Sequence, residues 1–200
     1  MKKNASNFLK LVFAGLSAAL VCMSTILFVV PLPTGGYVNL GDCFVILSGY
    51  MLGPVYGALA AGIGSALSDI FLGFGIYAPA TFIIKGLMAV TAYFITLLAR
   101  KKTSPLKILN AASASVAAEA VMLSGYFLFE LVIYGYAGAF ADLLGNTIQA
   151  LFAVASYVAV YSFMLESKLF DYADNIINKN GVCDSLSYTP FLLKNLYVKI

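Results

Sequence analysis

Six ionisable side chains lie inside otherwise apolar stretches of the sequence. A charge near the centre of a bilayer costs at least about 3 kcal/mol on insertion scales, so each is a candidate functional residue. The chain has no His, and its three cysteines form no C-x-x-C pair, so we expect no metal site, heme site or disulfide scaffold. The six are Asp42, Asp69, Lys85, Glu119, Glu130 and Asp142.

The composition indicates that these residues belong to a membrane protein. Of the 200 residues, 62% are hydrophobic and 10% are charged, whereas a soluble domain has roughly 45–50% apolar and about 25% charged residues. A spanning helix needs about 20 mostly apolar residues. We therefore predict an all-α integral membrane protein, with little chain left for a soluble domain.

Turn-forming residues divide the apolar sequence into six predicted spans, a six-helix bundle. The divisions include the Pro and Gly cluster at 31–36, the pair Gly53-Pro54 and the cationic run at 100–102. We predict a transmembrane domain over residues 1–167 and a polar cytoplasmic tail over 168–200. The spans are 8–30, 40–52, 55–74, 80–99, 108–133 and 140–165, with loops at 73–79 and 134–138.

The cations predict the orientation of this bundle. Ten of the twelve Lys and Arg lie before the first span, between the fourth and fifth, or after the sixth, and Lys10 lies at the start of the first span. Cytoplasmic loops carry an excess of Lys and Arg. With six spans these segments share one side, so both termini are predicted to be cytoplasmic. Five spans would place the C-terminal lysines outside.

In this orientation the polar residues gather in the outer half of the membrane, and only Glu119 approaches the midplane. This distribution predicts a pocket that opens to the outside. Two alternatives stay open. Carboxylates near helix ends, such as Asp42 and Asp142, could simply contact interfacial water, and Lys85 could form a structural pair with a carboxylate.

Helical periodicity places further polar groups on shared faces. Glu119, Tyr126 and Glu130 share one face because they are 7 and 11 residues apart, and Thr81 and Lys85 are i,i+4 neighbours. Such faces suit a flat, polar, uncharged or zwitterionic small molecule. Ordinary packing is an equally good explanation for the tyrosines. The sixth span carries a similar cluster of Asn146, Gln149, Ala153 and Tyr157.

Small residues form a second pattern, which allows helices to approach closely in lipid. The first span has Ala14/Ala18 and Gly15/Ala19 at i,i+4. We expect internal packing for the third span, whereas the first could pack internally or against another subunit. The small residues around the third span are Gly53, Gly57, Ala61 and Gly64.

Four blocks of sequence, in order, resemble the substrate-binding (S) components of energy-coupling factor (ECF) vitamin transporters, most closely the riboflavin-type branch. A weaker resemblance covers about residues 8–165, and the tail departs from it. The blocks are PTGGYVNLGD at 33–42, LGPVYGA at 52–58, GIGSALSD at 62–69 and YAPATFIIKG at 77–86.

The resemblance implies a multi-pass protein of a prokaryotic cell membrane that works with a transmembrane coupling subunit and two ATPase subunits. It implies that Ala14 and Ala18 contact the coupling subunit and that the loop over 33–39 closes the pocket. It does not fix the vitamin. Together with the polar faces it gives these candidate substrate-binding residues: Tyr37, Asn39, Asp42, Asp69, Thr81, Lys85, Glu119, Tyr126, Glu130, Asn146 and Gln149.

The leading hypothesis is therefore a subunit of an ATP-driven importer that captures riboflavin or another B-type vitamin outside the cell. The alternative is a stand-alone carrier that couples uptake to protons through Glu119 or Lys85. A membrane enzyme is disfavoured because the sequence has no catalytic constellation or cofactor motif. No catalytic residue, cofactor, metal or nucleic-acid partner is expected. A structural or assembly protein would bind no ligand.

Overall fold

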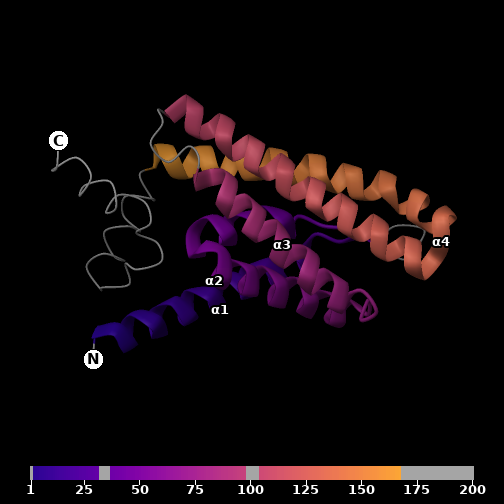
Figure 1. Cartoon of the computed structure of the whole chain (residues 1–200), viewed down its shortest axis with the longest axis horizontal. Coiled ribbons are helices and arrows are strands. Elements are labelled where there is room, and N and C mark those ends of the chain that lie inside the picture. Colours follow the sequence, from indigo (N-terminus) through magenta and orange to yellow (C-terminus); the bar gives the residue numbers. More distant parts are fainter. Residues whose placement is uncertain (1, 32–36, 98–103, 168–200) are drawn as a thin grey trace.

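The computed structural model describes residues 2–31, 37–97 and 104–167, and it is almost entirely helical (Figure 1). This confirms the predicted all-helical class, with the addition of a small antiparallel hairpin between α1 and α2. The predicted tail over 168–200 lies outside the described residues. The helices are α1 Lys2–Leu27, α2 Gly41–Leu72, α3 Ala78–Leu97 and α4 Ser104–Glu166, and the strands are β1 Val30–Pro31 and β2 Tyr37–Val38.

All four helices are long and apolar enough to cross a membrane. Large apolar side chains lie on their outer surfaces, for example Leu16 at 59% exposure and Phe71 at 69%. A soluble monomer rarely exposes extensive contiguous apolar surface, whereas lipid solvates such side chains without penalty. The exposed surface therefore agrees with a membrane setting.

Two of the helices are too long for a single crossing, and each bends at a glycine. α2 has 32 residues and α4 has 63, which would give straight helices of about 48 Å and about 95 Å against a hydrocarbon core of about 30 Å. Gly53 (φ 81°) and Gly135 (φ 72°) interrupt them with a positive φ that glycine adopts readily. Pro54 adds to the first break because it lacks a backbone N–H.

Both bends reverse the chain. Figure 1 shows that the part of α4 after the bend returns beside the part before it. In α2, a Cβ placed on Gly57 would lie 2.7 Å from Gly49 Cα, so the segments on either side of Gly53 fold against each other. The predicted break at Gly53-Pro54 is confirmed. The predicted loop over 134–138 is wrong, because only Gly135 departs from helical geometry there.

Close backbone contacts hold α1, α2 and α3 together. A Cβ on Gly64 would lie 2.4 Å from the carbonyl oxygen of Ala18, and a Cβ on Gly49 would lie 2.2 Å from that of Ala89. A side chain of any size would therefore separate these helices. The small residues of the predicted third span pack internally, as expected.

The two small-residue pairs of α1 face different surroundings. Ala14 is only 8% exposed and packs with Leu52 and Ala60, and Ala18 packs against the same cluster. Gly15, by contrast, has no atom near its would-be Cβ. Ala14 thus has an internal partner, and its proposed contact with another subunit stays a prediction.

The two ends of the helical region lie on the same side of the molecule. Figure 1 shows the Lys2 end of α1 and the Glu166 end of α4 at one end of the long axis, with the bend of α4 at the opposite end. This placement is what an even number of crossings requires.

Candidate ligand pocket

A pocket lies where β2, the end of α2, the start of α3 and the middle of α4 meet. It encloses about 460 Å³ of empty space, including its open mouth. Because it is lined from every helix, its shape depends on the whole bundle. The lining residues are Thr25, Tyr37, Asn39, Ser65, Asp69, Phe74, Tyr77, Thr81, Lys85, Tyr126, Glu130, Asn146 and Gln149.

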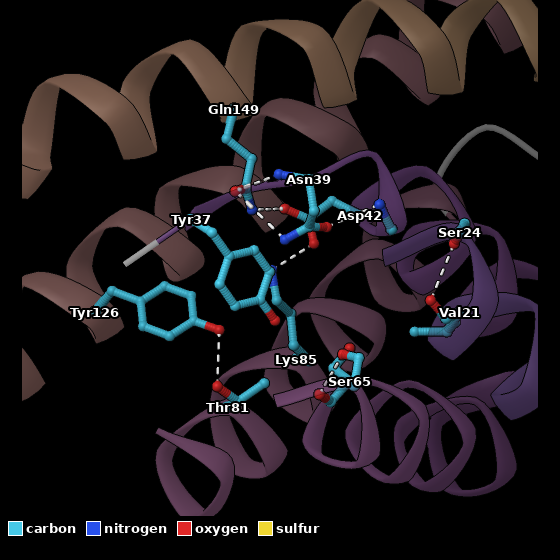
Figure 2. A network of polar contacts seen from close by, with 12 residues as sticks. Val21, Ser24, Tyr37, Asn39, Asp42, Ser65, Thr81, Lys85, Tyr126 and Gln149 are labelled. Atoms are coloured by element: carbon cyan, nitrogen blue, oxygen red, sulfur yellow. Dashed lines mark hydrogen bonds and ion pairs between the residues drawn. The ribbon is translucent and has the colours of Figure 1, made fainter. Parts of the chain in front are cut away.

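A buried polar network joins α2, α3 and α4 beneath this pocket. The ammonium of Lys85 donates to Asp42 Oδ1, and Gln149 Nε2 donates to Asp42 Oδ2 at 2.6 Å (Figure 2). The Asp42 and Lys85 side chains are 1% and 3% exposed. Removing one partner of a buried pair leaves an uncompensated charge. The structural pair left open by the sequence is therefore present, and Asp42 does not contact interfacial water.

The segment between β2 and α2 is attached to the same network. The backbone N–H of Asn39 donates to Gln149 Oε1 at 3.1 Å, and Asn39 Nδ2 lies 3.4 Å from the same oxygen. The Asn39 side chain also accepts a 2.8 Å hydrogen bond from the backbone N–H of Gly41. The side-chain amide of Gln149 therefore connects Asn39, in the segment before α2, to Asp42 in the first turn of α2.

Aromatic side chains form the other wall. The Tyr37 hydroxyl is hydrogen-bonded to Asp69, and its ring centroid lies 4.9 Å from that of Phe74. The Tyr126 hydroxyl lies 3.0 Å from Thr81 Oγ1. Figure 2 shows the Tyr126 hydroxyl directed at Thr81. These rings offer flat surfaces for a planar ligand.

Two tyrosines of the pocket, Tyr37 and Tyr77, lie outside the helices, and their hydroxyls stay protonated. Burial raises the pKa of Tyr37, and the carboxylate of Asp69 raises it further. Burial also raises the pKa of Tyr77, with additional contributions from Tyr134 and the nearby carboxylates. Both hydroxyls are therefore protonated at neutral pH, and that of Tyr37 donates its proton to Asp69.

Four buried carboxylates have oxygens without hydrogen-bond partners among the described residues, and one of them is Asp69, at Oδ2. Glu119 and Asp142 lack partners at both oxygens, and Glu130 lacks one at Oε2. Glu130 Oε1 is 3.5 Å from Asn146 Nδ2. All four are at most 2% exposed. Within residues 2–31, 37–97 and 104–167, no three His, Cys, Asp or Glu side chains are grouped as a metal site would require.

The structure brings most of the predicted binding residues to one place. All of them line the pocket except Asp42, which lies behind Lys85 and Gln149, and Glu119, which lies within electrostatic range of Asp42 and Lys85. Tyr157 is fully buried beside Tyr161, with ring centroids 5.9 Å apart, so it belongs to the core. Whether the lining residues touch a ligand stays a prediction.

The sequence did not single out four lining residues: Thr25, Ser65, Phe74 and Tyr77. Thr25 and Ser65 carry small neutral hydroxyls, which satisfy local backbone carbonyls in many helices and so give no signal of depth. Phe74 and Tyr77 lie within the turn at 73–77. Their position in the outer loop next to a predicted pocket was the available signal.

Comparison with known proteins agrees with this architecture. The model of a family described as "ECF-type riboflavin transporter, S component" matches residues 5–166. A protein of Pyrococcus woesei, described only as an uncharacterized protein in gap 3'region, is 34% identical over 131 residues, which is 65% of this chain and 84% of the relative. The family match covers all four helices and every residue that lines the pocket.

A transport family and several apolar helices together describe a multi-pass protein of the prokaryotic cell membrane, and not an enzyme. The described residues provide a polar, ring-lined pocket, which suits reversible capture of a small molecule. The chain belongs to the family of ECF-type riboflavin transporter S components.

Proposed function

We propose that this protein is the vitamin-capturing subunit of an ATP-driven ECF importer. It takes riboflavin or another B-type vitamin from outside the cell and delivers it inward with a coupling subunit and two ATPase subunits. The observation that carries the proposal is the pocket, which lies among polar side chains from every helix. Family membership supports the same function.

The proposed topology has six spans over residues 1–167, with both termini in the cytoplasm. The reversals at Gly53 and Gly135 would turn four long helices into six crossings. The second crossing would be short, because only about 12 residues of α2 precede Gly53, or about 18 Å of helix. The cation-free connections would then face outward, together with the mouth of the pocket.

The proposed capture step is closure of the connection over 33–39. Tyr37 and Asn39, at its end, already contact Asp69 and Gln149 on two different helices. Opening the connection would break these contacts and widen the entrance. Residues 32–36 lie outside the described part of the chain. The proposal for delivery is a reorientation of the whole subunit, driven by the ATPase partners.

The proposed contact with the coupling subunit is the first helix, at Ala14 and Ala18. Ala18→Trp should abolish uptake while leaving ligand affinity unchanged, because Ala18 is only partly buried. Lost ligand binding in this variant would instead show that the bulky side chain disrupts packing between α1 and α2.

A second candidate function is proton-coupled transport by this chain alone. One observation favours it: Glu119 is buried with both oxygens unpartnered near Asp42 and Lys85. Uptake by vesicles that contain only this protein, abolished by a protonophore, would support the carrier and contradict the importer subunit.

The test of the proposed function begins with the purified protein. Mass spectrometry of the small molecules that co-purify should detect a vitamin, and flavin absorbance would identify riboflavin. Uptake of that molecule should then require co-expressed coupling and ATPase subunits. A preparation that carries no small molecule and binds no vitamin would overturn the proposal.

A further inference from the structure

Carboxyl groups outnumber basic groups around the pocket. Five carboxylates lie in or beside it, at positions 42, 69, 119, 130 and 142, and all are at most 2% exposed. The lining includes a single cation, Lys85. The sequence has no other Lys or Arg over 11–99, nor over 108–167. In the proposed topology, no basic side chain from the outer connections can therefore reach the pocket.

The single cation is already engaged. Lys85 donates to Asp42 and lies 5.4 Å from the centroid of the Tyr126 ring. The Gln149 amide also donates to Asp42, at 2.6 Å. An anionic ligand would have to break this buried pair to find a positive partner, which would leave Asp42 uncompensated.

The acceptor capacity of the pocket, by contrast, is only partly used. Glu130 lines the pocket, is 2% exposed, and its Oε2 has no hydrogen-bond partner among the described residues. Asp142 lies within electrostatic range of Glu130, and neither of its oxygens is paired there. A buried acceptor without a partner costs free energy. A ligand that donates hydrogen bonds and carries positive charge would remove this cost.

Aromatic rings stand next to these carboxylates. Tyr77 lines the pocket, and its ring centroid is 5.2 Å from that of Phe129 and 6.5 Å from that of Tyr126. Burial raises the pKa of Tyr77, and the charges of Glu130 and Asp142 contribute to the increase, so these carboxylates are its neighbours. Aromatic faces attract organic cations, whereas they provide no oxygen ligand for a metal ion.

We propose that this pocket selects a flat organic cation, with its charged nitrogen beside Glu130 and its ring against Tyr77 and Tyr126. The inference rests on the proposed function and names the class of ligand for the same site. It also changes the expectation from sequence, which favoured an uncharged or zwitterionic molecule. Asp142 places a second carboxyl group within electrostatic range of Glu130.

The first experiment compares ligands that differ in charge on the unmodified protein. Pyridoxamine and pyridoxine form a matched pair, because an ammonium group replaces a hydroxyl. Affinities are measured by calorimetry in detergent for this pair, for cationic thiamine, for neutral riboflavin, for anionic pantothenate and for calcium chloride. We expect the tightest ligand to be a cation, and pyridoxamine to bind at least about tenfold more tightly than pyridoxine.

The second experiment removes one negative charge at a time. Glu130→Gln should weaken binding of the tightest cation by at least about tenfold, with less effect on a neutral ligand. Glu166→Gln is the matched control, because Glu166 is exposed at the far end of α4, and it should leave all affinities unchanged. If Glu130→Gln fails to fold, the ligand comparison on the unmodified protein decides.

The outcomes separate the two proposals. Tightest binding of riboflavin, pyridoxine or pantothenate would overturn the cation inference and leave the vitamin-binding function standing. Binding of calcium alone would overturn the inference in favour of a metal site. A protein that binds none of the six probes and carries no co-purified small molecule would overturn both.

Discussion

The two faces of α3 are packed in different ways. Toward α2, backbone meets backbone where Gly49 is pressed against the Ala89 carbonyl, and the Lys85–Asp42 pair is the polar exception. Toward α4, the outer part of the contact consists of polar side chains, such as Thr81 with Tyr126, while Ile84 packs against Gly125 further along. At the contact between Gly49 and Ala89 there is no space for a larger side chain. The outer part of the second contact, with α4, consists of groups that can exchange one hydrogen-bond partner for another.

This difference indicates how a small membrane protein can be both stable and responsive. The glycine contacts fix α1, α2 and α3 at short distances, where dispersion forces and close packing act without help from water. The polar contacts gather around the pocket, where a ligand can replace a partner. We therefore expect mutations at the glycine contacts to reduce stability and mutations at the polar contacts to reduce affinity, with the Lys85–Asp42 pair affecting both.

The largest effect is expected for Lys85→Met. This change leaves Asp42 buried with only the Gln149 amide as a partner, and breaking a buried pair typically costs about 3–5 kcal/mol. Thermal unfolding in detergent should show a large loss of stability, and ligand binding should be abolished. The double variant Asp42→Asn/Lys85→Met removes both charges and should regain part of the stability. Equal stability of the single and double variants would contradict the role of the pair.

The next effect in size is expected for Gly49→Ala. The added Cβ would meet the Ala89 carbonyl oxygen at 2.2 Å, and overpacking of this kind typically costs about 1–3 kcal/mol. Thermal unfolding should occur at a lower temperature, while ligand affinity measured well below that temperature should change little. Gly15→Ala is the control, since nothing lies within 4 Å of that position. Equal unfolding temperatures for the two variants would show that α2 and α3 can separate freely.

The sequence predicted the fold well where a single residue type decides the local structure. Gly53-Pro54 ends a helix because proline lacks an N–H and glycine accepts a positive φ, so that break was visible in advance. At Gly135, glycines and tyrosines suggested a loop over 134–138, yet all but one of these residues keep helical geometry. The number of residues in a turn depends on how the two flanking helices pack against each other. That packing cannot be read from the local sequence.

The sequence predicted which residues belong to the candidate site better than it predicted which of them contact one another. Buried charge is costly in lipid, which is why residues such as Lys85 and Glu130 stood out and why they lie together. The choice of Asp42 as the partner of Lys85 depends on the rotation of α2 about its axis. Periodicity gives which residues share a face, but not the direction in which that face points.

A smaller effect is expected for Gln149→Leu. It removes the amide that connects Asn39 to Asp42 while keeping an apolar side chain of similar length. Losing hydrogen bonds to a charged group typically costs about 1.5–3 kcal/mol. We expect roughly a tenfold loss of ligand affinity, mainly through faster release measured by stopped flow. Thr147→Val on the same helix is the control, because its hydroxyl bonds to the Leu143 carbonyl within α4. An unchanged release rate would show that Asn39 is held without Gln149.

The smallest effect is expected for Tyr37→Phe, which separates the two contacts that hold the connection against the end of α2. The variant loses the hydroxyl contact with Asp69 and keeps the ring beside Phe74. One hydrogen bond to a charged group is worth about 1.5–3 kcal/mol, and water that enters an open pocket can replace part of it. We expect affinity to fall by a few-fold. Tyr37→Ala removes both contacts and should weaken binding further. Equal losses in the two variants, measured by calorimetry, would show that the Asp69 contact alone holds the connection and that ring packing contributes nothing. Unchanged affinity in Tyr37→Phe would show that the ring packing holds Tyr37 in place and that the Asp69 contact contributes nothing.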